Sequence, residues 1–177
     1  LYTRGYSWEN DVYEKELVKE QVNSLLMEAE LKAEYIRIID DCFEDFILKV
    51  KNLMKLELIF RTQGRKFITD SNGERFIDGK NLPLLKMSQI KEVLSKLKSE
   101  LNRPVMLNGM KSSFCPVTYC YGKLFEALAI SLVSYIVSNL EGRKSAQPEA
   151  VKMAMIERYK NTPSAISDGY YNQLVTT

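Results

Sequence analysis

Residues 119–140, YCYGKLFEALAISLVSYIVSNL, decide the fold of this chain, because they predict a helix with apolar or small side chains on every face. From Leu124 to Leu140 the only charged residue is Glu126. A helix that is apolar all round is a buried helix. Its densest apolar run, Ala127 to Val137, has 11 residues and is too short to cross a bilayer, which takes about 20. We therefore predict a core helix over 124–140 and no membrane span.

Amphipathic segments predict that further helices surround this core helix. Apolar residues recur at three- and four-residue steps over 14–30, 31–60, 89–101 and 149–159. In the longest of these, 31–60, the apolar seam alternates strictly between steps of three and four, as in helices that pack along a long partner. The residues of this seam are Ile36, Ile39, Phe43, Phe46, Val50 and Leu53.

The period changes after the longest helix. Lys66–Thr69 and Arg75–Ile77 are short β-prone runs on either side of Asn72-Gly73, and an Asn-Gly pair supplies the positive φ angles of a hairpin turn. We predict a small β-hairpin at about 66–77. The expected fold class is therefore mainly α, a helical domain with one small hairpin.

Composition excludes several kinds of chemistry. A chain of 177 residues with 45% hydrophobic and 27% charged residues is typical of one globular domain. The absence of histidine excludes Ser-His and Cys-His nucleophilic pairs and His-ligated zinc. Three cysteines, Cys42, Cys115 and Cys120, favour reduced thiols, and with no secretory signal in the sequence we expect a cytoplasmic protein.

The net charge of +2 is unevenly distributed, with −5 over residues 1–60, +6 over 61–111 and +1 over 112–177. Arg61, Arg65 and Lys66 flank the predicted hairpin in the basic third and are candidate nucleic-acid-binding residues, although lysine-rich segments are often simply solvated. Four carboxylates on the longest helix offer a possible cation site, but they lie off the apolar seam and favour a solvated acidic face. These carboxylates are Asp40, Asp41, Glu44 and Asp45.

Two short motifs carry the remaining candidate residues. Ser7 is suited to cap a short helix with Glu9 in its first turn, which is an ordinary helix start. Lys123, in Tyr121-Gly122-Lys123, places one ammonium beside the apolar core helix. Such a lysine either extends to solvent or serves a function.

Residues 2–10, YTRGYSWEN, together with Tyr121-Gly122-Lys123, resemble motifs of the Toprim-type nuclease effectors of bacterial phage defence. That family includes the effector of the PARIS system and is related to the OLD-family nucleases. The resemblance implies that Ser7 and Glu9 match a Ser-x-Glu motif on the metal side, and that Lys123 matches the lysine that meets charge on the scissile phosphate. The implied cofactor is Mg²⁺.

The resemblance also implies a longer parent protein. Residues 1–13 would end a truncated α/β Toprim-type core, and 14–177 would form the helical domain. The family's other carboxylates, a glutamate and an Asp-x-Asp pair, would precede Leu1, so this chain alone would be inactive. The intact parent would cleave RNA or DNA when an ATPase partner releases it, and a homodimer is a further expectation.

An alternative function is a non-catalytic helical interaction or dimerisation module, in which the seam from Ile36 to Leu53 binds another subunit. The nuclease hypothesis makes a geometric prediction that the module does not. Glu9 and Lys123 are 114 positions apart. If they serve one phosphodiester centre, their side-chain ends lie within roughly a nanometre, with room for a metal and a phosphate between them.

Overall fold

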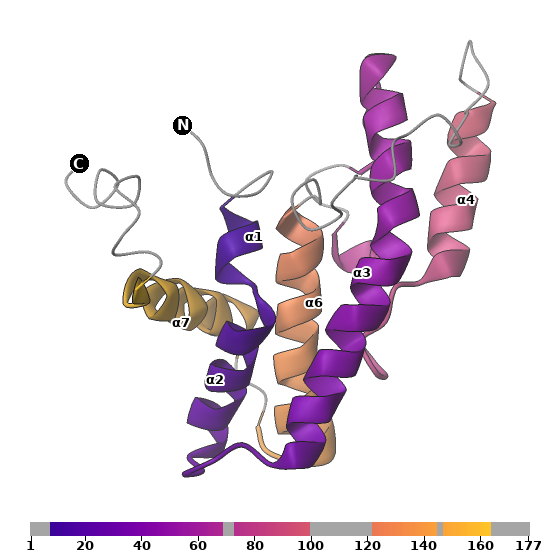
Figure 1. Ribbon diagram of the computed structural model, residues 1–177. Coiled ribbons are helices and arrows are strands. Elements are labelled where there is room, and N and C mark those ends of the chain that lie inside the picture. The colour runs from indigo at the N-terminus through magenta and orange to yellow at the C-terminus, as the bar shows by residue number, and fades with distance from the viewer. Residues whose placement is uncertain (1–7, 69–72, 100–121, 145–146, 164–177) are drawn as a thin grey trace.

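The computed structural model describes residues 8–68, 73–99, 122–144 and 147–163, which fold into a mainly helical domain (Figure 1). In chain order its α-helices are α1 (Glu9–Val12), α2 (Lys15–Leu26), α3 (Ala33–Thr62), α4 (Met87–Lys98), α6 (Gly122–Ser134) and α7 (Pro148–Lys160). A 3₁₀ helix, η1 (Glu74–Phe76), precedes α4, and a π-helical segment, η2 (Tyr135–Leu140), extends α6. The mainly α fold class is confirmed.

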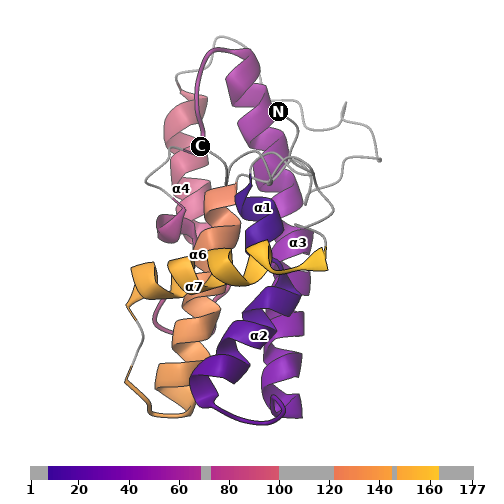
Figure 2. The ribbon, with the colours of Figure 1, turned by 90° about the vertical axis from the view of Figure 1, so that its left-hand side faces the viewer.

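Helix α6 lies at the centre of the domain, as its apolar sequence predicts. It contacts α1, α2, α7 and η1, and Leu124, Leu128 and Leu132 are fully buried. Figure 1 shows α6 between α2 and α3, and Figure 2 shows α7 lying across it. Every neighbouring helix therefore contributes to covering one apolar element.

The apolar length of this helix also satisfies a composition test for membrane segments. Within the part of the chain that the structure describes, Gly122–Leu140 is the one helix that is long and apolar enough to cross a membrane. Core helices of globular proteins pass the same test, and 56% of this segment is buried inside the domain. Its packing accounts for its apolar character.

The seam of α3 packs against the chain's own core. Phe125 of α6 lies with its ring centroid 6.4 Å from that of Phe43 and 5.1 Å from that of Phe46. Val50 and Leu53 are at most 1% exposed. The seam that we expected to accept another subunit is thus buried in the chain's own core from Ile39 to Leu53, while Ile36 at its start is exposed.

Polar contacts tie the ends of the helices together. Glu141, directly after η2, accepts a hydrogen bond from the Tyr35 hydroxyl and pairs with Lys32, at the start of α3. The hydrogen bond from Lys32 is the main reason why the pKa of Glu141 is lowered. Arg158 of α7 donates to the side chain of Gln21 on α2 at 2.9 Å, which holds α7 across the bundle.

The described residues do not form the hairpin predicted at about 66–77. Phe67 and Ile68 each donate a backbone N–H to the buried carboxylate of Glu57 at 2.8 Å, so these donors are satisfied without a partner strand. Residues 74–76 form η1, and an isolated antiparallel bridge joins Ile77 to Leu85. Residues 69–72, which include most of the predicted turn, lie outside the described residues.

The expected boundary near residue 13 falls inside the packed core. Val12 and Tyr13 are 2% and 0% exposed and belong to the same hydrophobic cluster as Leu17 and Phe46. The described residues from Glu9 onward therefore share one core. Ser7 lies outside the described residues.

Candidate functional site

The start of α6 is fixed by a close contact between two backbones. A Cβ atom on Gly73 would lie 2.5 Å from the carbonyl oxygen of Lys123, so only glycine fits at this contact. Gly73 has a φ of −56°, which any residue adopts, so the left-handed turn predicted for Asn72-Gly73 is not the reason for this glycine. Its role is to let η1 approach the first turn of α6.

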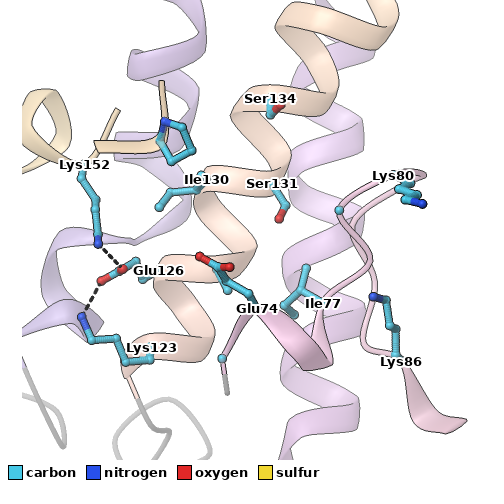
Figure 3. Close-up of a pocket in the computed structure, with 14 residues that line it drawn as sticks. Glu74, Ile77, Lys80, Lys86, Lys123, Glu126, Ile130, Ser131, Ser134 and Lys152 are labelled. Carbon is cyan, nitrogen blue, oxygen red and sulfur yellow. Dashed lines mark hydrogen bonds and ion pairs between the residues drawn. The ribbon is translucent and has the colours of Figure 1, made fainter. Parts of the chain in front are cut away.

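Lys123 lies between two buried carboxylates. Its Nζ atom is 3.3 Å from Oε1 of Glu9 and 2.9 Å from Oε2 of Glu126. The other oxygen of Glu126 is 2.8 Å from Nζ of Lys152, on α7. Figure 3 shows Glu126 between the two lysines. We call Glu9, Lys123, Glu126 and Lys152 the charged cluster, which joins α1, α6 and α7.

The carboxylates of the charged cluster hold both lysines in the charged form. Burial lowers the pKa of Lys123, but the hydrogen bonds and negative charges of Glu126 and Glu9 outweigh it and raise the pKa above its ordinary value. The hydrogen bond to Glu126 is the largest cause that raises the pKa of Lys152. Both ammonium groups are therefore fully protonated at neutral pH.

Tyr13 lies beside the charged cluster with its side chain completely buried. Burial is the first cause that raises the pKa of this phenol, followed by the negative charges of Glu126, Glu9 and Glu149. Its hydroxyl has no hydrogen-bond partner within the described residues. Tyr13 is consequently a neutral phenol whose O–H remains available as a donor.

The predicted proximity of Glu9 and Lys123 is found, but the predicted space between them is not. The two side chains meet in a direct ion pair, which leaves no room for a metal and a phosphate in this arrangement. The described residues also contain no group of three or more Asp, Glu, Cys or His side chains positioned to hold a metal ion. These residues alone therefore do not fit a Mg²⁺ centre.

The other residues assigned to sites from the sequence lie elsewhere. Arg61 donates its Nε–H to the buried carboxylate of Glu57, so this candidate nucleic-acid-binding residue has a structural contact. Arg65 and Lys66 are exposed just beyond α3. On the acidic face of α3, Asp40 pairs with Lys15 at 3.2 Å and with Lys19 at 2.8 Å. These ion pairs are consistent with a solvated face.

A pocket of about 680 Å³ opens beside the charged cluster (Figure 3). One wall carries Lys123, Glu126 and Lys152, and the opposite wall carries Lys80 and Lys86 from the segment between η1 and α4. The rest of the lining comes from η1 and the residues next to it, from α6 and from α7: Gly73, Glu74, Ile77, Gly79, Ala127, Ile130, Ser131, Ser134 and Pro148.

Sequence reasoning assigned no site role to five charged residues that line the pocket: Glu74, Lys80, Lys86, Glu126 and Lys152. Glu126 had a detectable signal, because it is the lone charge of the apolar helix and follows Lys123 by three positions, which places both on one face. The others had none, since only the fold brings η1, the segment after it and α7 beside α6.

Comparison with protein-family models, curated proteins and solved structures finds no match for this chain.

Proposed function

We propose that this chain is part of a metal-dependent Toprim-type nuclease of phage defence, in which Lys123 stabilises charge on the scissile phosphate. One observation carries the proposal: Glu9 and Lys123, separated by 114 positions, lie 3.3 Å apart. Two charges so distant in sequence, one of them on a buried glutamate, have no local reason to meet. A shared site for the Ser-x-Glu and Gly-Lys motifs is one reason for them to do so.

The surroundings of Lys123 suit this role. Buried Leu124 and Phe125 follow it directly and lower the local dielectric, which strengthens the attraction between an ammonium and a phosphate. Glu126 orients the ammonium through a hydrogen bond and keeps it protonated. A phosphate oxygen that replaces Glu9 beside Nζ would meet a cation that is already charged and positioned.

The metal of this proposed nuclease requires ligands beyond those described. Glu9 would supply one carboxylate, and Ser7 and residues preceding Leu1 would supply the rest. We expect RNA or DNA as the substrate, a restraining ATPase partner, a homodimer and a cytoplasmic location on the resemblance alone. The interaction module is the weaker candidate, because Phe43 and Phe46 of its proposed seam are at most 3% exposed.

The test compares two lysines that share Glu126. Lys123→Gln and Lys152→Gln each remove one positive charge from the charged cluster while keeping a hydrogen-bond donor. In the longer protein with Mg²⁺, we expect Lys123→Gln to lower the cleavage rate about 10²- to 10³-fold, because the positive charge beside the developing oxyanion is lost. Lys152→Gln should retain most activity, since Lys152 does not pair with Glu9.

Cleavage of labelled RNA and DNA measures both rates, and circular dichroism verifies the fold of each variant. Glutamine is preferable to alanine at position 123, because its amide N–H can still donate a hydrogen bond to the buried carboxylates of Glu9 and Glu126, whereas alanine cannot. If the Lys123→Gln variant cleaved at the wild-type rate, the catalytic role of Lys123 would be refuted. Equal losses in the two variants would indicate that the charged cluster is only structural.

A further inference from the structure

The pocket beside the charged cluster contains two lysines that have no counter-ion. Neither Lys80 nor Lys86 forms an ion pair within the described residues, although the charge of Lys86 contributes to lowering the pKa of Asp78. Both residues line the pocket from the segment between η1 and α4, across from Lys123 and Lys152 (Figure 3). Two lysines in one pocket lining that form no ion pair with the described residues favour an anionic occupant.

The segment that carries these lysines is held in place by its own backbone contacts. The carboxylate of Asp78 accepts hydrogen bonds from the backbone N–H of Lys80 at 2.9 Å and of Asn81 at 3.3 Å. The N–H of Lys86 donates to the carbonyl of Phe76 at 2.8 Å. Asn139 of η2 donates its side-chain N–H to the carbonyl of Lys80 at 3.2 Å, which ties the segment to the core helix. These contacts fix the backbone at Lys80 and Lys86, so only their side chains must be ordered on binding.

The charges of the pocket leave a positive excess at this wall. Four lysines and two glutamates line it, for a net charge of +2. Glu126 is occupied by Lys123 and Lys152 at the opposite wall. With Glu9 included, the charged cluster is neutral. The remaining positive charge lies at Lys80 and Lys86 and is offset in part by Glu74, and solvent screens the exposed Glu74 and Lys80 alike.

Between the two charged walls the lining is mixed, with apolar side chains beside Ser131, Ser134 and the carboxylate of Glu74 (Figure 3). Ile77, Ala127, Ile130 and Pro148 supply the apolar surface, and Ser131 belongs to the same lining. An inorganic anion gains nothing from apolar surface, whereas an organic anion buries its carbon framework there. A volume of about 680 Å³ lies within the usual range for pockets that bind small organic molecules.

We propose that this pocket binds a nucleotide phosphate ester, with the phosphate between Lys80 and Lys86 and the nucleoside against the apolar lining. The ligand is either a free nucleotide or one nucleotide of a strand, because both present the same phosphate and the same flat, partly apolar base. The pocket binds this group without a metal and without cleavage, so the inference does not depend on nuclease activity.

Isothermal titration with adenosine monophosphate, inorganic phosphate and adenosine tests the proposal on the 177-residue chain. We expect adenosine monophosphate to bind with a Kd below about 1 mM and more tightly than either fragment, since each fragment uses only half of the site. Binding of inorganic phosphate as tight as that of the nucleotide would overturn the role of the apolar lining. Absence of nucleotide binding would overturn the site.

Variants of matched charge test the location. Lys80→Gln with Lys86→Gln should weaken nucleotide binding by about tenfold or more, because two charge-assisted hydrogen bonds are lost. Lys91→Gln with Lys96→Gln changes the net charge equally on the exposed surface of α4 and should leave the Kd unchanged. Equal weakening by both pairs would show that binding is non-specific, and the proposal would fail.

Ser131→Glu provides a second variant that leaves every lysine in place. It adds a carboxylate to the pocket wall and should also weaken binding, whereas unchanged binding would contradict the location. Titration with a trinucleotide then identifies the source of the phosphate. Tighter binding than adenosine monophosphate supports a strand, and weaker binding supports a free nucleotide.

Discussion

At the scale of single residues, Glu57 decides how the chain leaves its longest helix. Its carboxylate is 5% exposed and accepts hydrogen bonds from Arg61 and from the backbone of Phe67 and Ile68. A buried carboxylate is costly unless it is paired and hydrogen-bonded, and here both conditions hold. Glu57 therefore takes the place that a partner strand would have had in the predicted hairpin.

Removal of this carboxylate should be strongly destabilising. Glu57→Ala leaves two buried N–H groups without an acceptor and Arg61 without its ion pair, so we expect a loss of about 3 kcal/mol in the free energy of unfolding. Urea denaturation followed by circular dichroism measures it. The control is Glu157→Ala, which removes an exposed glutamate paired with Lys160 and should change stability by less than about 0.5 kcal/mol. Similar values for the two variants would contradict this role of Glu57.

The pKa of Cys42 predicts a protected thiol. The side chain is 1% exposed, and burial, followed by the charges of Asp45 and Asp41, raises the pKa from 9.0 to about 11. The thiolate is the reactive form, so at pH 8 alkylation by iodoacetamide should be about 100-fold slower in the folded chain than in urea. Mass spectrometry of the peptide that contains Cys42 measures both rates. Equal rates would show that the thiol is accessible.

The same pKa shift has a consequence for stability. Above pH 9 the unfolded chain loses the thiol proton, while the folded chain keeps it until about pH 11. The unfolded state is therefore favoured as the pH rises through this window. Cys42→Ser removes this contribution, so its free energy of unfolding should fall less steeply between pH 9 and 11 than that of the wild type.

At the scale of elements, the contact between η1 and α6 sets the position of Lys123. Gly73→Ala places a methyl group 2.5 Å from a backbone carbonyl that cannot turn away, and we expect a loss of about 2 kcal/mol from overpacking. Gly79→Ala is the matched control, because a Cβ at Gly79 has no heavy atom within 4 Å. Urea denaturation of both variants measures the difference. A Gly73→Ala variant as stable as Gly79→Ala would contradict the close contact.

At the scale of the whole molecule, the domain is organised by the burial of α6 and of the α3 seam in one core. Phe46 is 1% exposed and packs on Phe125. Phe46→Asp buries an unpaired charge, and we expect a destabilisation of more than about 4 kcal/mol and loss of the cooperative thermal transition. Leu48→Asp, two positions further along and 76% exposed, should fold normally.

Circular dichroism and light scattering together distinguish packing from subunit association. If Phe46→Asp stayed folded and changed only its oligomeric state, the seam would be an interface between subunits, contrary to its burial here. The alternation of three and four residues in the sequence is compatible with both outcomes, because it predicts a long partner without identifying it.

Local patterns in the sequence are enough to predict which segments are helical and which helix is central. The spacing of apolar residues over 124–140 and over 31–60 can be read directly from the sequence, because it depends only on residues near one another in the chain. The structure confirms both helices. The sequence also showed Glu126 as the lone charge of the core helix.

The contacts beside these helices depend on packing in three dimensions, which local patterns do not reveal. The contact between Phe46 and Phe125 and the ion pair between Glu9 and Lys123 join residues that are distant in sequence. The hydrogen bonds to Glu57 compete with the local preference of residues 66–77 for a hairpin. A short β-prone run pairs with a strand only if its backbone donors have no better acceptor, and Glu57 supplies one. The lysines that line the pocket follow no periodic pattern, so the sequence does not predict that they lie around one pocket. Packing of the apolar helix faces brings them there.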